Sequence, residues 1–243
     1  MHSAAIGFFV SLLVSQAYAA SESGHLETIK APSDSPAFEA EDEPATSINR
    51  NPIITVSTSD IKLLGCNTNQ QKLIEGAAIT ANVLVANAMT YLAELRPDIP
   101  QPRYTTWYGT YNKESYGTVV SLFAKMQNQA TSLTYDCKTC PKGFGPSKDL
   151  KNQAYVYTSA YSGGKYNKKI NFCGGFWKAP ITGIDSQAGK IIQELSRISE
   201  MGGTRDRVRG KESAKALAAR APESAVMNTD SYVYFAENTP ALS

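Results

Sequence analysis

Two polar segments in the C-terminal part of the chain have the spacing of a zinc-dependent hydrolytic site. They are Gln193-Glu194-Leu195-Ser196-Arg197 and Gly203-Thr204-Arg205-Asp206. Zinc endopeptidases commonly place two histidines four residues apart on one helical turn, H-E-x-x-H, with the Glu as general base. Here Gln193 and Arg197 stand at the histidine positions, and Glu194 stands between them. The spacing predicts the scaffold of such a site without its imidazole ligands.

The histidine content argues against a conventional zinc centre. The chain has two histidines, His2 and His25, and both lie far upstream of the predicted domain. Zinc binds neutral imidazole, thiolate or carboxylate donors in a near-tetrahedral array. Gln193 offers a weak amide oxygen, and Arg197 is a permanent cation with no acceptor lone pair. We therefore expect no cofactor in this protein.

The first 19 residues have the pattern of a secretory signal peptide. They contain no Lys, Arg, Asp or Glu, and an apolar run from Ile6 to Val14 leads to Ala17-Tyr18-Ala19. A small-x-small triplet after an apolar run is typical of signal cleavage, so we expect cleavage after Ala19 and secretion to the extracellular space. The run is too short for a membrane anchor. We expect no later stretch to be long and apolar enough to cross a bilayer.

Residues 20–51 are predicted to be an acidic, unfolded leader. They contain three prolines, few large apolar residues and seven acids against Lys30 and Arg50. From residue 45 onward the chain carries 23 Lys and Arg against 15 Asp and Glu. Charge runs are usually solvated, so the leader can be a spacer. It can also be a short propeptide that shields a basic surface until it is cut, for example after Arg50.

Residues 52–243 are long enough for one domain with its own core. The fold class that we predict is α+β, mainly helical with a small β-sheet. Helices are expected over 67–96, 115–130, 187–201 and 211–220, with Asp185-Ser186 capping the third and Gly202-Gly203 ending it. Strands are expected over 153–158 and 169–172, with a turn at 162–164, and Pro102–Gly109 is expected to be a loop.

The four cysteines, Cys66, Cys137, Cys140 and Cys173, are an even number in a chain with a secretory leader. Two disulfides are the natural interpretation, and three pairings are open. The spacing of Cys137 and Cys140 also fits a metal knuckle. That interpretation has little support, because the chain has no second knuckle and no nearby histidine.

Several longer segments resemble the deuterolysin, or aspzincin, metalloendopeptidases, most nearly their fungal lysine-specific (peptidyl-Lys) branch. The resemblance covers nearly all of residues 62–243. It is strongest over Pro102 to Gly109, Phe176 to Gly189, Gly202 to Thr204 and Ala225 to Asn238. It implies a zincin-like (aspzincin) fold, zinc as the family's cofactor, and disulfides Cys66–Cys137 and Cys140–Cys173.

The family's site is H-E-x-x-H followed by G-T-x-D-x-x-Y-G. Carried onto this chain, the resemblance implies that the two histidine ligands fall on Gln193 and Arg197 and the general base on Glu194. The third zinc ligand falls on Asp206, and the tyrosine that stabilises the oxyanion falls on Arg209. Three of these five positions are changed, so we expect the protein to be catalytically inactive, although its ancestry is that of an enzyme.

The family's preference for lysine is attributed to an acidic pocket near the C-terminus. The resemblance implies that Asp230 is one acid of this substrate pocket, and Val233 stands where the second is expected. The expected partner is a peptide or protein, with anionic ligands included because Arg197, Arg205, Arg207 and Arg209 are close together in sequence. We expect a monomer with no nucleic-acid or membrane partner.

Two roles are open for the arginines. One of them, Arg197 first, can form a salt bridge with Glu194 or Asp206 and stabilise the junction between the helix and the following loop. Alternatively, the four arginines together can bind an anion. Three functions follow: a binding protein without catalysis, an active endopeptidase with an atypical metal site, and a secreted structural protein.

Overall fold

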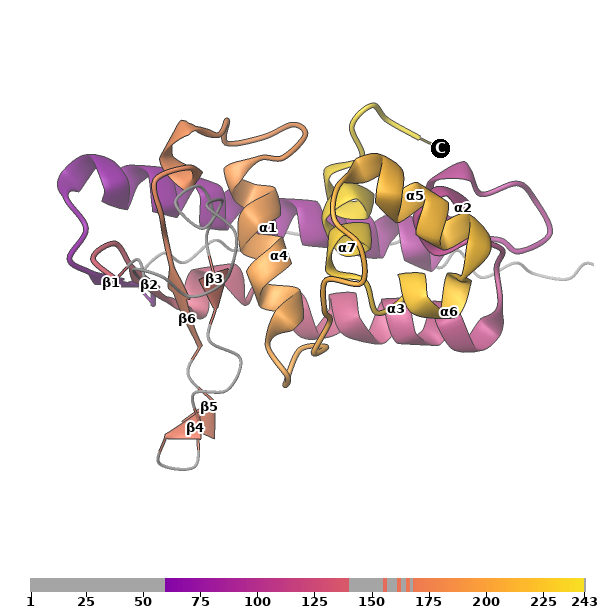
Figure 1. Cartoon of the computed structure of the whole chain (residues 1–243), viewed down its shortest axis with the longest axis horizontal. Coiled ribbons are helices and arrows are strands. Elements are labelled where there is room, and N and C mark those ends of the chain that lie inside the picture. The colour runs from indigo at the N-terminus through magenta and orange to yellow at the C-terminus, as the bar shows by residue number, and fades with distance from the viewer. Residues whose placement is uncertain (1–59, 140–154, 157–160, 163–164, 167, 243) are drawn as a thin grey trace, which may run out of the picture. The chain divides into compact units, whose positions relative to one another are not determined.

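The computed structural model describes residues 60–139, 155–156, 161–162, 165–166 and 168–242 (Figure 1). All of them belong to the unit formed by residues 49–243. The expected signal peptide and acidic leader lie outside the described residues, as do Cys140 and the ends of the strand expected over 153–158.

Helices make up most of the described structure. They are α1 (Thr68–Glu94), α2 (Pro102–Tyr108), α3 (Lys113–Met126), α4 (Gln187–Arg197), α5 (Lys211–Arg220), α6 (Pro222–Ala225) and α7 (Thr229–Glu237). Polar side chains cap the longer ones at their first turns. Asn67 and Gln70 form a reciprocal capping box at α1, and Asn112 and Ser186 accept amide hydrogen bonds at α3 and α4.

A small sheet lies at one end of the helices (Figure 1). β1 (Lys62–Leu64), β2 (Thr134–Asp136) and β6 (Lys169–Asn171) run parallel, and β3 (Tyr155–Val156) pairs antiparallel to β6. β4 (Tyr161–Ser162) and β5 (Lys165–Tyr166) form a separate antiparallel pair, and Gly163 and Gly164 of the predicted turn lie outside the described residues. The α+β, mainly helical fold is confirmed.

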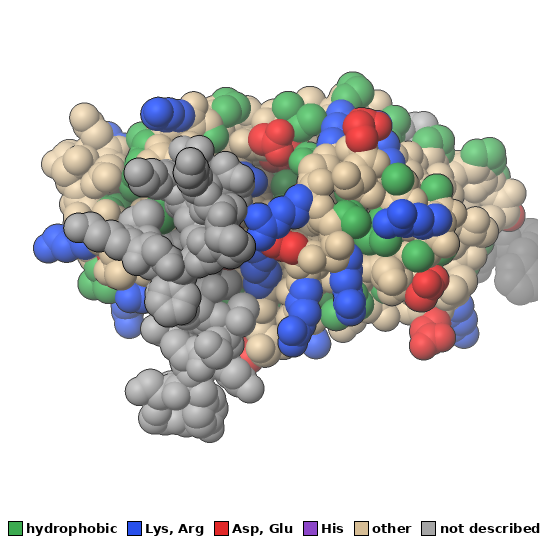
Figure 2. All heavy atoms as spheres, viewed as in Figure 1, with side chains coloured by type: hydrophobic (Ala, Val, Ile, Leu, Met, Phe, Trp, Pro, Cys, Tyr) green, Lys and Arg blue, Asp and Glu red, His purple; other side chains and the backbone are tan. Residues whose placement is uncertain are grey.

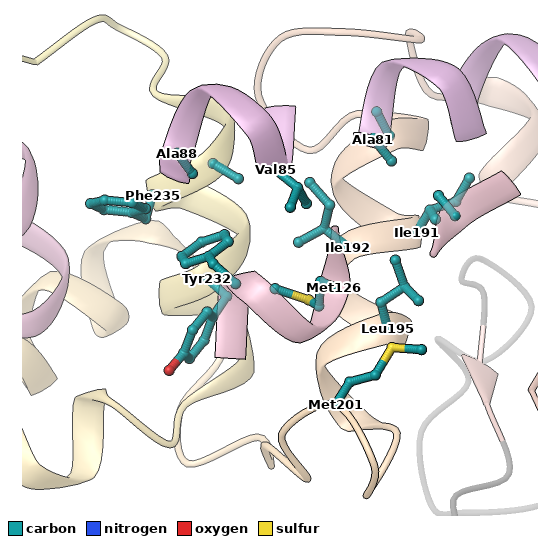
Figure 3. Packing of buried hydrophobic residues seen from close by; sticks show 14 of the residues in the cluster. Ala81, Val85, Ala88, Met126, Ile191, Ile192, Leu195, Met201, Tyr232 and Phe235 are labelled. Carbon is teal, nitrogen blue, oxygen red and sulfur yellow. The ribbon is translucent and has the colours of Figure 1, made fainter. Parts of the chain in front are cut away.

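Helix α1 is the central element of the core, and it packs against α3, α4 and α7. Its contact face is rich in alanine, which lets neighbouring helices approach closely. Figure 3 shows Ala81, Val85 and Ala88 of α1 beside apolar side chains of α4 and α7. The buried partners drawn there from these helices are Ile191, Ile192, Leu195, Tyr232 and Phe235. Through this packing, α1 fixes the two helices that carry the candidate site.

Among the described residues, α1 is the one helix that is long and apolar enough to cross a membrane, judged by length and composition. The expectation that no stretch after the leader meets this test is therefore wrong. The physical reason is that a 27-residue helix at the centre of the core needs a largely apolar surface. Ile74, Val85 and Leu92 of α1 are fully buried in that core.

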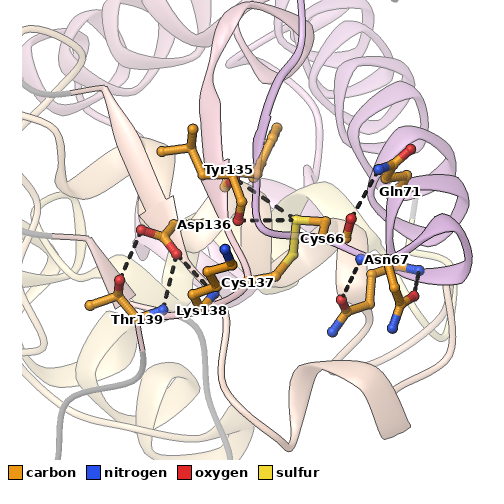
Figure 4. Close-up of a disulfide and its surroundings, with 10 residues drawn as sticks. Cys66, Asn67, Gln71, Tyr135, Asp136, Cys137, Lys138 and Thr139 are labelled. Carbon is orange, nitrogen blue, oxygen red and sulfur yellow. Dashed lines mark hydrogen bonds between the residues drawn. A yellow bond between two sulfur atoms is a disulfide. The ribbon is translucent and has the colours of Figure 1, made fainter.

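A disulfide joins Cys66, which precedes α1, to Cys137, which follows β2 (Figure 4). This confirms one of the two bonds implied by the family resemblance. Cys173 is not a free thiol, and its expected partner Cys140 lies outside the described residues. The bond ties the edge strand β1 and the start of α1 to β2.

Asp136 organises the chain beside this disulfide (Figure 4). Its carboxylate accepts hydrogen bonds from the amides of Lys138 and Thr139 at 2.9 and 3.0 Å, and Lys169 lies 3.1 Å away. Burial raises the pKa of Asp136, but these amides and the Lys169 ammonium outweigh burial and hold its pKa below the ordinary value. The folded protein therefore favours the ionised carboxylate.

We expect Asp136 to contribute to acid unfolding. Because its folded pKa is lowered, its stabilisation is present above the unfolded value of about 3.9 and is lost as the pH falls towards the folded value. Asp136→Asn should therefore flatten the dependence of the free energy of unfolding on pH below about pH 4. Urea titrations at a series of pH values measure this slope. An identical slope in both proteins would contradict the assignment.

Three helices differ from the sequence-based expectations. Pro102–Gly109, expected to be a loop, is α2, with Pro102 in its first turn and Gly109 ending it at a φ of 80°. Its aromatic residues Tyr104, Trp107 and Tyr108 are buried, so they pack in the core and do not line a loop. Helices α6 and α7 were not expected at all.

Candidate functional site

Helix α4 carries three of the predicted site residues on its last two turns. Gln193 and Glu194 are buried, and Arg197 ends the helix with a partly buried side chain. The apolar residues Ala188, Ile191, Ile192 and Leu195 of α4 are buried in the core. A helical period places residues 190, 193, 194 and 197 next to one another along one side of α4.

Glu237 at the end of α7 fixes the start of α4. Its carboxylate accepts hydrogen bonds from the amides of Asp185 and Ser186 at 3.1 and 2.8 Å, and from the Ser186 hydroxyl at 2.8 Å. Unpaired amides at a helix N-terminus bind anions well, and here the anion comes from the same chain. Burial raises the pKa of Glu237 despite these bonds. This contact holds the start of α4 against the end of α7. It therefore fixes the relative positions of the site residues on the two helices.

We expect Gly189→Ala to disrupt the contact between Glu237 and the start of α4. A methyl group at Gly189 would collide with the Glu237 carboxylate and press on Val233. Because three hydrogen bonds hold that carboxylate, the substitution should cost about 2–3 kcal/mol of unfolding free energy. The matched control is Gly117→Ala on α3, where a methyl group meets nothing within 4 Å. It should instead stabilise the protein by about 0.5–1 kcal/mol. Equal melting temperatures for the two variants would contradict the role of the Glu237 contact in holding α4 against α7.

The loop after α4 brings Asp206 back beside the C-terminal end of that helix. Gly203, at a φ of 63°, belongs to the turn, and the buried hydroxyls of Ser196 and Thr204 are 2.7 Å apart. The side-chain oxygen of Asn228 accepts hydrogen bonds from the amides of Arg207 and Val208 at 3.0 and 3.1 Å. These contacts fix the loop that carries Asp206 and Arg209.

Arg197 lies between the two retained acids. Its guanidinium donates to Glu194 Oε1 at 2.6 Å and to Asp206 Oδ1 at 2.5 Å. Arg209 donates to Asp206 Oδ2 from Nε at 3.0 Å and from a terminal nitrogen at 2.8 Å. We call these four residues the Arg197 cluster. The predicted salt bridge of Arg197 with Glu194 or Asp206 is confirmed, and both acids take part in it.

The charges in the Arg197 cluster stabilise each other's ionised forms. Burial alone would lower the pKa of Arg197, but the carboxylates of Glu194 and Asp206 outweigh it and raise the pKa above its ordinary value. Burial alone would raise the pKa of Asp206, but Arg197 and then Arg209 hold it below the ordinary value. The cluster is therefore a set of ion pairs at neutral pH.

The zinc that the family resemblance implies does not fit these residues. The guanidinium of Arg197 contacts both acids, so a dication near them would be repelled by a fixed positive charge. Gln193 donates its side-chain amide to Asp230, which commits this side chain to α7. Within the described ranges, no three His, Cys, Asp or Glu residues are grouped so that they could hold a metal ion.

Asp230 lies at the first turn of α7 and is buried. Its carboxylate accepts from Gln193 Nε2 at 2.9 Å and from the amide of Gly210 at 2.7 Å. Val233, one turn further along α7, is also buried and lies near the Gly189 backbone. The structure thus brings Asp230 next to the other predicted site residues, through its contact with Gln193.

A pocket of about 390 Å³ opens beside this contact. It is bounded by α4, α7, the loop before α5 and the turn of residues 176–178. Its lining residues are Gly175, Phe176, Ala179, Asp185, Lys190, Gln193, Arg209, Gly210, Asp230 and Tyr234. Lys190, which was not among the predicted site residues, donates to Gln193 Oε1 at 3.2 Å. The signal that could have found it is its place one helical turn before Gln193.

The arginines do not act as one surface. Arg197 and Arg209 are engaged by the two acids, whereas Arg205 and Arg207 are exposed, and neither forms a salt bridge within the described residues. Figure 2 shows Lys and Arg side chains around the middle of the face that α4 and the following loop occupy, with acidic side chains among them. The four arginines of the predicted anion site therefore differ in role. Two of them form ion pairs within the protein, and the other two are exposed to solvent.

Comparison with known proteins identifies the family. The model for lysine-specific metallo-endopeptidases matches residues 98–237. A peptidyl-Lys metalloendopeptidase of Grifola frondosa is 37% identical over 187 residues, which are 76% of this chain and 49% of that protein. One of Pleurotus ostreatus is 38% identical over 181 residues, which are 74% of this chain and 98% of that protein.

The solved structure of a zinc peptidase from Grifola frondosa superposes with a TM-score of 0.63 at 37% identity. The match covers 73% of this chain and 100% of that one. The chain spans about half the length of the Grifola relative compared above, and nearly all of the Pleurotus relative. The chain belongs to the lysine-specific metallo-endopeptidase family and has its aspzincin fold.

Proposed function

We propose that this protein is a secreted member of the family that binds a peptide or protein and does not hydrolyse it. The observation that carries the proposal is the position of Arg197, whose guanidinium bridges Glu194 and Asp206. The residue types at Gln193, Arg197 and Arg209 also depart from the family's ligand and oxyanion residues. The leader of residues 1–19 supports secretion.

The chemistry of the donors supports the absence of hydrolysis. Peptide hydrolysis by this family's scheme needs a water whose pKa falls from about 15.7 towards neutrality on a metal ion. The acids that would help to bind the metal are paired with Arg197, and no histidine is present among the described residues. Glu194 then has no activated water to deprotonate. Arg209 can still donate hydrogen bonds to an anion, but it is already paired with Asp206.

A binding function is supported by the pocket beside Gln193. The lining of the pocket beside Gln193 includes the aromatic residues Phe176 and Tyr234 and the polar residues Asp185, Lys190, Gln193, Arg209 and Asp230. Pockets of about 300–1,000 Å³ with a few convergent polar groups are typical ligand sites. Hydrogen bonds of Glu237 to the start of α4 and of Asn228 to the loop before α5 hold elements that bound this pocket.

The test combines metal content with peptide cleavage. The purified secreted protein is dialysed against trace zinc, and its zinc content is measured by elemental analysis. We expect well under one zinc per chain and no cleavage of lysine-containing peptides by mass spectrometry. About one zinc per chain, together with cleavage that Glu194→Gln abolishes, would overturn the proposal in favour of an active endopeptidase with an atypical metal site.

A further inference from the structure

Another pocket, of about 240 Å³, lies between α2, α5 and the segment that follows α7. Helices α2 and α5 pack against each other at the end of the domain away from the sheet (Figure 1). We call this cavity the α2–α5 pocket, and it shares no lining residue with the pocket beside Gln193. Its lining comes from Thr106 and Trp107 of α2, Lys211 and Lys215 of α5, and Thr239, Pro240 and Leu242 after α7.

Hydrogen bonds hold the segment after α7, which forms one wall of the α2–α5 pocket. The side chain of Asn238 donates to the carbonyl of Leu242 at 3.2 Å and accepts from the Leu242 amide at 2.9 Å. The ammonium of Lys211 donates to the carbonyl of Thr239 at 3.0 Å, which ties this segment to α5. The wall is therefore fixed by the protein itself, as is usual for small-molecule sites.

The charged residues of this lining all have one sign. Lys211 and Lys215 are four residues apart on α5, and no Asp or Glu of the described chain lines the pocket. Lys215 pairs with Glu212, which lies outside the lining and exposes 82% of its side chain, so the pair contributes little. The hydroxyls of Thr106 and Thr239 can donate or accept, so they favour neither sign of charge. The two ammonium groups therefore decide the preference, and it is for an anion.

Both ammonium groups have donors available for a ligand. Each has three N–H donors and donates one hydrogen bond within the described residues, Lys211 to the Thr239 carbonyl and Lys215 to Glu212. Side chains four residues apart on a helix lie on the same face, with their Cβ atoms about 5–6 Å apart. One anionic group with several oxygens can therefore accept from both lysines.

An aromatic wall adjoins these lysines. Lys215 Nζ lies 5.9 Å from the centroid of the Trp107 ring, and this ring stacks on Tyr234 at 5.2 Å between centroids. Pro240 and Leu242 add further apolar surface to the lining. The pocket thus combines two cations with an apolar surface, which suits a ligand that has a charged group and an apolar body.

We propose that the α2–α5 pocket binds a small organic anion, with Lys211 and Lys215 holding its carboxylate or phosphate group and Trp107, Pro240 and Leu242 contacting its apolar body. Lysine binds such oxygens as a compact point charge. The ligand is small, because drug-sized ligands occupy pockets of about 300–1,000 Å³. The inference is independent of the proposed peptide binding, which uses the pocket beside Gln193.

The first test measures dissociation constants by calorimetry with the purified secreted protein at pH 7. Phenyl phosphate and benzoate separate the two anionic groups, and benzylamine is a cation of similar size. We expect at least one of the two anions to bind at least about tenfold more tightly than benzylamine, because the lysines attract an anion and repel a cation. Inorganic phosphate should bind at least about tenfold more weakly than the better anion, because it buries no apolar surface.

Variants of the two lysines test the charge. The double variant Lys211→Gln and Lys215→Gln should lower the affinity for the better anion at least about tenfold, whereas Lys211→Arg with Lys215→Arg should keep most of it. The matched control is Arg220→Gln, which removes an exposed cation at the end of the same helix, outside the lining. It should leave the affinity unchanged. Cooperative thermal unfolding shows that each variant folds.

Fluorescence tests the location of the bound anion. The chain has two tryptophans, Trp107 and Trp177, so Trp177→Phe leaves Trp107 as the one reporter. In this variant, the better anion should change the emission of Trp107 and saturate the change at the concentrations that calorimetry gives.

Each outcome decides one part of the inference. Benzylamine that binds as tightly as both anions would overturn the charge preference. Unchanged affinity in the glutamine double variant, or binding without a change in Trp107 emission, would overturn the site. Equal affinities for inorganic phosphate and the better anion would overturn the apolar contact, and no binding by any of the compounds would overturn the whole inference. The proposed function stands or falls separately, because its pocket has other lining residues.

Discussion

Replacing Arg197 by Met should lower the free energy of unfolding by about 3 kcal/mol, because removal of one partner leaves buried charges without compensation. Glu194 is buried and Asp206 is largely buried, and both accept hydrogen bonds from the lost guanidinium. Chemical denaturation at neutral pH measures the change. Arg207→Met removes an exposed arginine on the same loop and should stay within about 0.5 kcal/mol of the wild type.

A rescue variant makes this test specific. Glu194→Gln and Asp206→Asn, combined with Arg197→Met, remove all three charges together, and replacement of a whole buried ion network is often close to neutral. We expect the triple variant to recover most of the stability lost in Arg197→Met. Arg209 then loses its partner, but its side chain is mostly exposed, so this loss should cost little. An unchanged midpoint for Arg197→Met would show that the Arg197 cluster does not stabilise the fold.

Restoring the family's residues should restore metal binding. The variant Gln193→His, Arg197→His and Arg209→Tyr provides two imidazoles beside Asp206, a donor set that catalytic zinc sites use with water as the fourth ligand. We expect the zinc content to rise to about one per chain. Without metal, this variant should be less stable than the wild type, because Glu194 and Asp206 have lost Arg197.

Zinc should therefore raise the melting temperature of the restored variant and leave that of the wild type unchanged. A ligand at a hundredfold excess over its dissociation constant stabilises the folded state by about 2.7 kcal/mol. Arg209→Tyr alone is the control, because it keeps Arg197 between the acids and should bind no zinc. If the restored variant folded and still bound none, positions 193, 197 and 206 would not form the expected metal site.

Much of the fold could be predicted because its longer helices show one apolar face. Helices α1, α3, α4 and α5 have this pattern, and their predicted ends are within a few residues of the observed ones. Helix α7 escaped prediction because all of its residues are buried, so its sequence has no polar side from which to read a period. Strands β1 and β2 have three residues each, too few to show alternation.

The positions of the site residues were predicted from the spacing of a motif. The long-range contacts that hold these residues in place were not predicted. The frame of Glu194, Arg197 and Asp206 follows from a known motif. Nothing in the local sequence indicates that Glu237 caps α4 from 51 residues away. The same holds for the contact between Gln193 and Asp230, which depends on how α4 packs against α7. Such contacts arise from tertiary packing, which a periodic pattern does not encode.

The double contact of Arg197 also bears on the evolutionary history of the protein. A single reversion of Arg197 to His would remove two ion pairs and still supply one imidazole where a metal centre needs two. This substitution alone would therefore cost stability without completing a two-histidine metal site, and selection removes changes that lower stability below what function needs. While residue 193 is glutamine, stability therefore favours arginine over histidine at position 197.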